Sequence, residues 1–234
     1  MDGLCTMVED GLRQQCVRVT DHSDGDEYLI VRLEHVEPAL NIVNFYGMME
    51  GKEGEEGKKK VVESWTKLRK ELLLIEGRNE AVVLMGDFNR AIGDDDLGVP
   101  GNKKKISHGG DMVRDLMREG EYVLVNRLSL AKGGPWTRVD PALCVLSCLD
   151  LTLISSSLLP CVKGFVIDDE REFTPKRAER RQGKFGFTYT DHFAQELVMI
   201  LPSSRLKIVK ETGWNTFKPG AWEKYKEVTK KRLT

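Results

Sequence analysis

Three short segments of the chain carry acid, amide and imidazole side chains of the kinds that hydrolyse phosphate esters. They are Gly86-Asp87-Phe88-Asn89, Ser147-Cys148-Leu149-Asp150-Leu151 and Thr190-Asp191-His192. Phosphodiester hydrolysis needs a carboxylate to deprotonate the attacking water, an amide to orient it, oxygen ligands for a hard divalent cation, and a cationic donor for the phosphate oxygens. Together the three segments therefore predict a site for phosphoryl chemistry.

Each segment taken alone is a weak signal. An Asp that follows a buried strand is more often a turn or helix-capping residue than a catalyst, and a single Asp-His pair is common by chance. The prediction depends on all three segments meeting in one pocket, which requires strands that end at the same place.

Predicted strands accompany all three segments. Ala81–Met85 is a continuous apolar run that enters Gly86–Asn89, and Leu149–Ile154 and His192–Leu201 indicate two further strands. Strand ends hold side chains rigidly and can bring distant parts of the chain together. We expect the site at the ends of these strands.

The remaining pattern alternates strands and helices, which is typical of a mixed α/β fold. Tyr28–His35 and Ala39–Tyr46 predict an antiparallel hairpin. Gly51–Lys60 is polar and glycine-rich and predicts a loop. Apolar residues at helical spacing predict a helix after that loop and another after residue 110, and Tyr122–Asn126 predicts a further strand; the helical positions are Val61, Val62, Trp65, Leu68, Leu72, Ile75, Met112, Val113, Leu116 and Met117.

The composition is that of a globular protein. The chain has 234 residues, of which 40% are hydrophobic and 31% charged, which excludes a wholly disordered or collagen-like chain. Its longest apolar runs fall far short of the roughly 20 residues that span a bilayer, and we expect no membrane segment and no signal peptide. Five scattered cysteines without a C-x-x-C pair favour a reducing, intracellular compartment over a structural zinc site.

The net charge of -1 conceals an uneven distribution. Residues 205–234 contain nine basic and three acidic residues. A second basic run, Lys176–Lys184, is a candidate phosphate-contacting loop. Most such runs are simply solvated charged surface, and that interpretation stays open.

The motif order resembles the endonuclease/exonuclease/phosphatase superfamily. The resemblance is carried by Asn44-Phe45-Tyr46, Gly86–Asn89, Ser147–Leu153 and Thr190–His192, and it extends from residue 28 to residue 201. This superfamily includes abasic-site endonucleases, pancreatic-type deoxyribonucleases and the endonuclease domains of non-LTR retrotransposons. The resemblance implies a DNase I-like, four-layer α/β/β/α sandwich.

Two further segments are similar to the retrotransposon branch. They are Gly134-Pro135-Trp136-Thr137-Arg138 and the W-N-x-x-K-P-G-x-W stretch Trp214–Trp222. In such polyproteins the second segment lies between the nuclease and the reverse transcriptase, so the resemblance implies a reverse transcriptase domain on the C-terminal side and a nuclear location.

The resemblance also implies a role for each matching residue. Asp87 resembles the general base that activates the water, and Asn89 resembles the residue that orients it. Asp191 is similar to a metal-site carboxylate. Together with Asp87 and Asn89 it is a candidate ligand of Mg2+ or Mn2+.

The remaining roles concern the phosphate. His192 is similar to the imidazole that bonds the scissile phosphate, and Asp150 resembles the carboxylate that pairs with this histidine and keeps it charged. Tyr46 resembles a phosphate-contacting tyrosine.

The sequence departs from the family pattern before Tyr46. The family places a metal-binding Asn and the principal metal-binding Glu there, on two early strands, but only 45 residues precede Tyr46. Glu27 and Glu34 are two carboxylates that precede Tyr46, and neither matches the pattern. We therefore expect an amino-terminally truncated domain with weakened metal binding and an exposed sheet edge.

These observations lead to one hypothesis and two alternatives. The hypothesis is a partial endonuclease-like domain over 1–201, followed by a basic linker or tail over 202–234, that hydrolyses DNA through contacts with the phosphate backbone. The first alternative is a catalytically dead remnant that only binds nucleic acid through its basic segments. The second is a phosphatase of the same superfamily.

Overall fold

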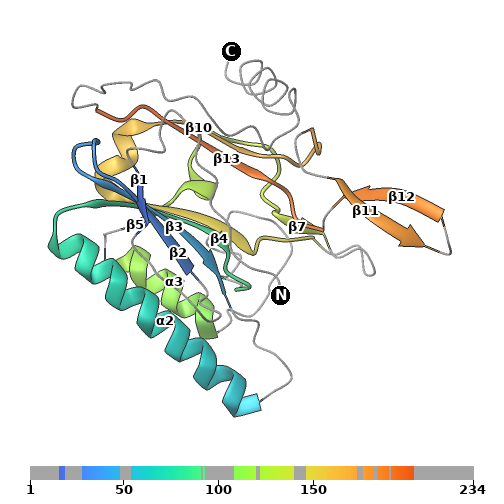
Figure 1. The fold of residues 1–234 in the computed structure, drawn as a ribbon, viewed down its shortest axis with the longest axis horizontal. Helices are drawn as coiled ribbons and strands as arrows, with labels where there is room; N and C mark the ends of the chain where they lie inside the picture. Colours follow the sequence, from blue (N-terminus) through green and yellow to red (C-terminus); the bar gives the residue numbers. More distant parts are fainter. Residues whose placement is uncertain are drawn as a thin grey trace.

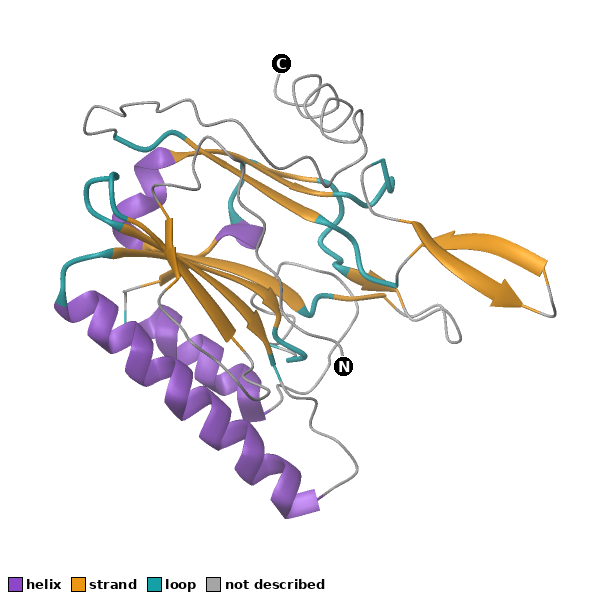
Figure 2. Cartoon of the chain, in the orientation of Figure 1, coloured by secondary structure: helices purple, strands orange, loops and turns teal. Residues whose placement is uncertain are grey.

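The computed structural model describes residues 16–18, 28–47, 54–90, 92, 108–119, 122–139, 146–172, 176–181, 184–189 and 191–202. Two helices cover one face of a large sheet, and a smaller sheet packs against its other face (Figures 1 and 2). The predicted tail lies outside the described residues from position 203 onward, and so does Trp214–Trp222. Within the described ranges, no helix combines the length and the apolar character needed to cross a membrane.

The larger sheet has six strands in the order β1-β2-β3-β4-β9-β5. The predicted hairpin is confirmed, because β2 pairs antiparallel with β3. Strand β4 runs parallel to β3 and antiparallel to β9. The strands are β1 (Cys16–Arg18), β2 (Tyr28–Leu33), β3 (Leu40–Tyr46), β4 (Ala81–Asp87), β5 (Tyr122–Leu124) and β9 (Asp150–Ser155).

Helices α2 (Gly54–Gly77) and α3 (His108–Arg118) pack on this sheet. The predicted loop over Gly51–Lys60 is wrong from Gly54 onward, because α2 already begins there. Acidic residues in the first turn favour the helix N-terminus, and ion pairs such as Lys58 with Glu55 at 2.7 Å add support along the exposed side. Four of the six apolar positions predicted for this helix are buried, namely Val61, Leu68, Leu72 and Ile75, and the other two, Val62 and Trp65, are partly buried.

The smaller sheet has three strands in the order β13-β10-β6. They are β6 (Ala131–Lys132), β10 (Val162–Ile167) and β13 (Gln195–Met199), and the short helices η1 (Val125–Arg127) and η2 (Ser156–Cys161) connect strands of the two sheets. The predicted strand over Tyr122–Asn126 stops at Leu124, where η1 begins.

The apolar core forms two layers that share strand β4. Val82 and Leu84 belong to the layer against the helices, whereas Ala81 and Val83 belong to the layer between the sheets, which includes Phe165 of β10. This division follows from the alternation of side chains along a strand. The predicted mixed α/β sandwich is confirmed, and the residues described here form three of its four expected layers.

Two short ribbons complete the structure. β7 (Arg138–Val139) pairs with β8 (Leu146–Ser147), and β11 (Lys176–Arg181) pairs with β12 (Lys184–Tyr189). The β11–β12 hairpin projects from the body of the domain (Figure 1). The predicted loop over Lys176–Lys184 is therefore wrong. Its many charged residues favoured a loop, but Lys176–Arg181 forms a strand. Its partner strand β12, with the sequence KFGFTY, contains residues that favour β-structure.

A partly buried polar cluster lies beside the first residue of β4, next to the end of β2 and the start of β3. Glu80 accepts hydrogen bonds from Arg32 at 2.7 Å and from Asn41 at 3.0 Å, and Arg78 lies 3.1 Å from the same carboxylate. Burial alone would raise the pKa of Glu80, but the hydrogen bonds from these three residues hold its pKa at about 2. The cluster therefore fastens the start of β4 to the neighbouring strands.

This cluster predicts a pH-dependent stability. The pKa of Glu80 falls from 4.5 to about 2 on folding, so its stabilisation is complete above pH 4.5 and is lost as the pH falls toward 2. We expect Glu80→Gln to lower the free energy of unfolding at neutral pH by roughly 1–3 kcal/mol. This difference in stability from the wild type should shrink as the pH falls from 4.5 toward 2. Urea unfolding at several pH values measures both effects, and a deficit independent of pH would contradict the assignment.

Candidate active site

One row of residues across three strands brings predicted site residues together. Tyr46 at the end of β3 pairs with Asp87 at the end of β4, and Asp87 pairs with Asp150 at the start of β9. Paired residues on neighbouring strands place their side chains on the same face. This face points toward the second sheet, because Val83 and Ile154, which lie on it further along β4 and β9, belong to the layer between the sheets.

The turn after β4 depends on Gly86 and Phe88. Gly86 has a φ of +142°, and a Cβ at this position would lie 2.0 Å from the carbonyl oxygen of Phe45. Only glycine fits this conformation and this close approach. The fully buried ring of Phe88 packs edge-on against Phe45 with ring centroids 5.1 Å apart, which anchors the turn to the core.

The polar residues of the turn are held by their own hydrogen bonds. Oδ1 of Asp87 accepts from the backbone N–H of Asn89 at 2.8 Å, and the Asn89 side-chain amide donates to the carbonyl of Gly47 at 2.9 Å. Asn89 has a φ of +49°, a conformation that asparagine tolerates better than most residues. The second oxygen of Asp87, Oδ2, is the one that faces the histidine.

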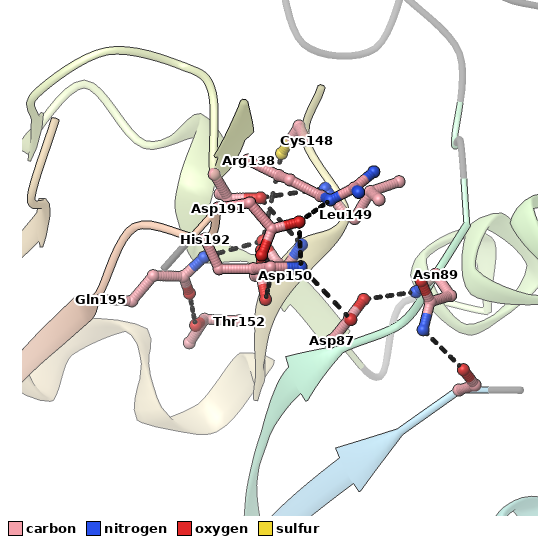
Figure 3. A network of polar contacts seen from close by, with 12 residues as sticks. Asp87, Asn89, Arg138, Cys148, Leu149, Asp150, Thr152, Asp191, His192 and Gln195 are labelled. Carbon is pink, nitrogen blue, oxygen red and sulfur yellow. Dashed lines mark hydrogen bonds and ion pairs between the residues drawn. The ribbon is translucent and has the colours of Figure 1, made fainter. Parts of the chain in front are cut away.

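His192 lies between two carboxylates. Its Nδ1 is 2.9 and 3.0 Å from the two oxygens of Asp150, and its Nε2 is 3.8 Å from Oδ2 of Asp87 (Figure 3). Nε2 is also 4.0 Å from Oδ2 of Asp191. The Asp150 contact fixes the ring and directs Nε2 toward the other two aspartates.

The carboxylates shift the pKa values in this cluster. Burial acts to lower the pKa of His192, but the hydrogen bond to Asp150 and the charges of Asp150, Asp87 and Asp191 raise it. Burial and the charge of Asp150 raise the pKa of Asp87. The cluster thus favours a charged imidazole beside a carboxylate whose basicity is increased.

Asp191 takes part in a different pairing. Its Oδ2 accepts a hydrogen bond from Nε of Arg138 at 2.9 Å. Burial acts to raise the pKa of Asp191, but this hydrogen bond and the charge of His192 lower it. The side chain remains 38% exposed, so it can still meet a ligand.

The last predicted residue, Tyr46, lies at the rim of the site. Its side chain is 47% exposed, and its register position opposite Asp87 places it beside the carboxylate. All six predicted site residues are therefore brought to one end of the layer between the sheets, and their catalytic and metal-binding roles remain predictions.

Residues that the sequence analysis did not assign hold Asp150 in place. Oγ1 of the buried Thr137 accepts hydrogen bonds from the backbone N–H groups of Leu149 and Asp150, both at 2.9 Å. Nε2 of Gln195 donates to the Asp150 carbonyl at 2.8 Å, and its Oε1 accepts from Thr152 at 2.7 Å. Thr137 lies in the segment Gly134–Arg138 that the motif comparison had already marked, whereas no motif marked Gln195.

Thr137 yields a second prediction. Thr137→Val keeps the shape of the side chain but leaves two backbone N–H groups without their acceptor, so we expect it to lower the free energy of unfolding by roughly 1–3 kcal/mol. Thr137→Ser retains the hydroxyl and should cost clearly less. Urea unfolding measures both variants, and equal stability of the two would show that the hydroxyl is unimportant.

The oxygen donors of the site suit a hard divalent cation. Asp87, Asp150 and His192 offer ligand atoms that all lie within 4.8 Å of one another. The predicted ligand Asp191 is not part of this group, and its role as a ligand remains a prediction. Carboxylate oxygens are the ligands that Mg2+ and Mn2+ prefer.

Of the two early glutamates, the structure describes Glu34 only, and Glu34 lies away from this site. Glu34 follows the end of β2 that is remote from Tyr46 and Asp87, and it pairs there with Arg32. Glu27 lies outside the described residues. Within the described ranges, no glutamate joins the Asp87–Asp150–His192 group.

Comparisons with known proteins rest on structure alone. No protein-family model and no curated protein sequence matches the chain. The 3' phosphatase NExo from Neisseria, solved with a product DNA hairpin, superposes with a TM-score of 0.55 at 18% identity, covering 80% of this chain and 72% of that chain. The APE2 catalytic domain from Xenopus laevis gives 0.56 at 15% identity, covering 77% of this chain and 57% of that chain.

A third structure agrees with these two. An AP endonuclease from Archaeoglobus fulgidus matches with a TM-score of 0.52 at 14% identity, covering 79% of this chain and 68% of that chain. At such identities a structural likeness speaks for the fold and not for the activity. The chain has the fold of the endonuclease/exonuclease/phosphatase superfamily.

Proposed function

We propose that the chain is a divalent-metal-dependent hydrolase that cleaves phosphodiester bonds of DNA. The observation that carries the proposal is the position of His192 between Asp150 and Asp87. Such an arrangement offers a base, a charged donor and carboxylate oxygens within one small group of side chains, which is what phosphoryl transfer to water requires.

Asp87 is the general base in this proposal. A carboxylate whose pKa is raised by burial and by Asp150 accepts a proton more readily than an ordinary surface aspartate. Asp87 takes a proton from the water as the water oxygen bonds to phosphorus and the phosphorus–oxygen bond to the leaving strand breaks. The leaving oxygen then takes a proton from solvent, which balances the reaction.

His192 stabilises the negative charge that grows on the phosphate. Asp150 accepts from Nδ1 and favours the charged ring, so Nε2 carries a proton that can be donated. Nε2 lies 3.8 Å from Oδ2 of Asp87, on the side of the ring opposite Asp150, and in this proposal its N–H donates to a phosphate oxygen. Exposed Tyr46 supplies a second donor at the rim.

The cation and the DNA complete the proposal. Mg2+ or Mn2+ held by Asp87, Asp191 and Asn89 would supply Lewis-acid stabilisation of the phosphate charge. The basic residues of β11 and the tail would contact the DNA backbone electrostatically. The retrotransposon origin, a reverse transcriptase neighbour and a nuclear location belong to the same proposal and rest on the motif resemblance.

A substrate panel tests the proposed function. Fluorescein-labelled DNA duplexes that are intact, carry an abasic site or end in a 3' phosphate are incubated with the chain in Mg2+, Mn2+ or EDTA. We expect strand cleavage with either metal and none in EDTA. Release of phosphate without strand cleavage would favour the phosphatase alternative, and binding without any product would favour the catalytically dead remnant.

A further inference from the structure

Arg138 brings a fixed positive charge to the site. Among the described residues, it is the only arginine or lysine in an ion pair with Asp87, Asp150 or Asp191. No sequence motif assigned it a role. Figure 3 shows its guanidinium on the same side of the site as Asp191.

The backbone around Arg138 is held firmly against the histidine. Arg138 and His192 form an antiparallel bridge. On either side of this bridge, the N–H of Val139 donates to the carbonyl of Asp191 at 2.8 Å and the N–H of Phe193 donates to the carbonyl of Thr137 at 2.7 Å. Directly opposed residues in such a ladder lie on the same face, so Arg138 and His192 face the same space.

The guanidinium has donors left for a ligand. Nε donates to Asp191 at 2.9 Å, and in the described part of the chain neither terminal amino group of this guanidinium has a hydrogen-bond or ion-pair partner. The side chain is 31% exposed, so these groups are within reach of solvent. Asp191 thus holds one edge of the guanidinium and leaves the other edge open.

The site carries more negative than positive side chains, so a positively charged guanidinium would help it to bind a phosphate. Asp87, Asp150 and Asp191 outweigh the single imidazolium of His192, and this surplus would repel a phosphodiester. Arginine binds phosphate through a planar pair of N–H donors and stays charged at any working pH. A guanidinium anchored by one aspartate therefore offsets part of the repulsion and orients the incoming phosphate.

We infer that Arg138 binds the substrate phosphate next to His192, with Asp191 as the residue that positions its guanidinium. The inference rests on the proposed function for the identity of the substrate. It gives Asp191 a role that does not depend on a cation, in addition to its predicted role as a metal ligand.

The first test measures binding without catalysis. The full chain is titrated against a fluorescein-labelled DNA duplex in EDTA over a series of salt concentrations. We expect Arg138→Gln to bind roughly tenfold or more weakly, with a salt dependence reduced by about one phosphate contact. The matched control is Arg118→Gln on α3, which loses an exposed arginine paired with Asp115 and should bind like the wild type.

The second test separates phosphate binding from a merely structural ion pair. Asp191→Asn removes the negative charge of this ion pair but keeps the guanidinium, and the amide oxygen of asparagine can still accept the hydrogen bond from Nε that positions it. Our inference predicts unchanged or tighter DNA binding by Asp191→Asn in EDTA, and intermediate binding by Arg138→Lys. If Asp191→Asn loses as much affinity as Arg138→Gln, or if Arg138→Gln binds like the wild type, the inference is overturned.

The two tests distinguish a failure of this inference from a failure of the proposed function. A wild-type chain that never cleaves DNA would refute the proposed hydrolysis, and the binding comparison in EDTA would still decide the role of Arg138. A wild-type chain that cleaves DNA while Arg138→Gln binds normally would refute only the role of Arg138. Thermal unfolding of each variant confirms that the folded state is compared.

Discussion

Asp87→Asn is expected to slow metal-dependent DNA cleavage by roughly 10²–10⁴-fold, the usual contribution of a general base. The amide keeps the size of the side chain and can still accept the hydrogen bond from Asn89, so the turn should stay intact. It cannot take a proton from water, however, and it is a poorer ligand for a cation. Single-turnover cleavage of a labelled duplex in excess enzyme measures the loss.

A matched control isolates this effect. Asp115 is an aspartate on α3 with an exposed side chain, and Asp115→Asn should cleave at the wild-type rate. DNA binding by Asp87→Asn in EDTA should be unchanged or tighter, because a negative charge has been removed. Wild-type cleavage by Asp87→Asn would exclude Asp87 as the base.

His192→Ala and Asp150→Asn are expected to cause the second large loss, and their effects should not add. Each single change should slow cleavage by roughly 10²–10⁴-fold, because the first removes the charged donor and the second removes the partner that orients and charges it. Residues that act as one unit give non-additive effects. The double variant should therefore be only slightly slower than His192→Ala.

The rates of the four proteins in this cycle measure the coupling. Additive losses would mean that Asp150 acts on the reaction separately from His192, which would contradict the role inferred from the 2.9 Å contact. Urea unfolding of Asp150→Asn controls for loss of the backbone contacts around this residue.

The grouping of Asp87, Asp150 and His192 could be predicted from sequence, because these residues belong to local motifs at strand ends. The segment Gly86–Asn89 predicts a turn, because the glycine that the turn requires and the aspartate that accepts its Asx-type hydrogen bond both lie within four residues. The strand β4 and the hairpin β2–β3 follow from short-range apolar patterns. Such features need no knowledge of the rest of the chain.

The unpredicted parts depend on contacts between distant residues. Gln195 supports Asp150 from 45 residues away, and Arg138 reaches Asp191 across 53 residues; both contacts exist only because β9, β13 and the 137–139 segment meet in space. Strand β10 was not predicted either, because Lys163 and Gly164 interrupt its apolar run. The many basic residues of Lys176–Lys184 led to the prediction of a loop, whereas Lys176–Arg181 forms strand β11.

Asp191 shows how the structure refines a motif. The resemblance implied a metal ligand, and the structure adds an ion pair with Arg138. The two roles are compatible for a carboxylate with two oxygens, and they predict different results for Asp191→Asn in EDTA and in Mg2+. The variant should bind DNA in EDTA as tightly as the wild type or more tightly, and it should cleave more slowly when the metal is added.

The nicking of supercoiled plasmid DNA tests the central claim most directly, because one broken phosphodiester bond relaxes the whole molecule. Wild-type chain and Asp87→Asn, purified in parallel, are incubated with plasmid in Mg2+ and in EDTA. Our account predicts relaxed plasmid only with the wild type and only in Mg2+. Plasmid left supercoiled by the wild type, or relaxed equally by both proteins, would contradict it.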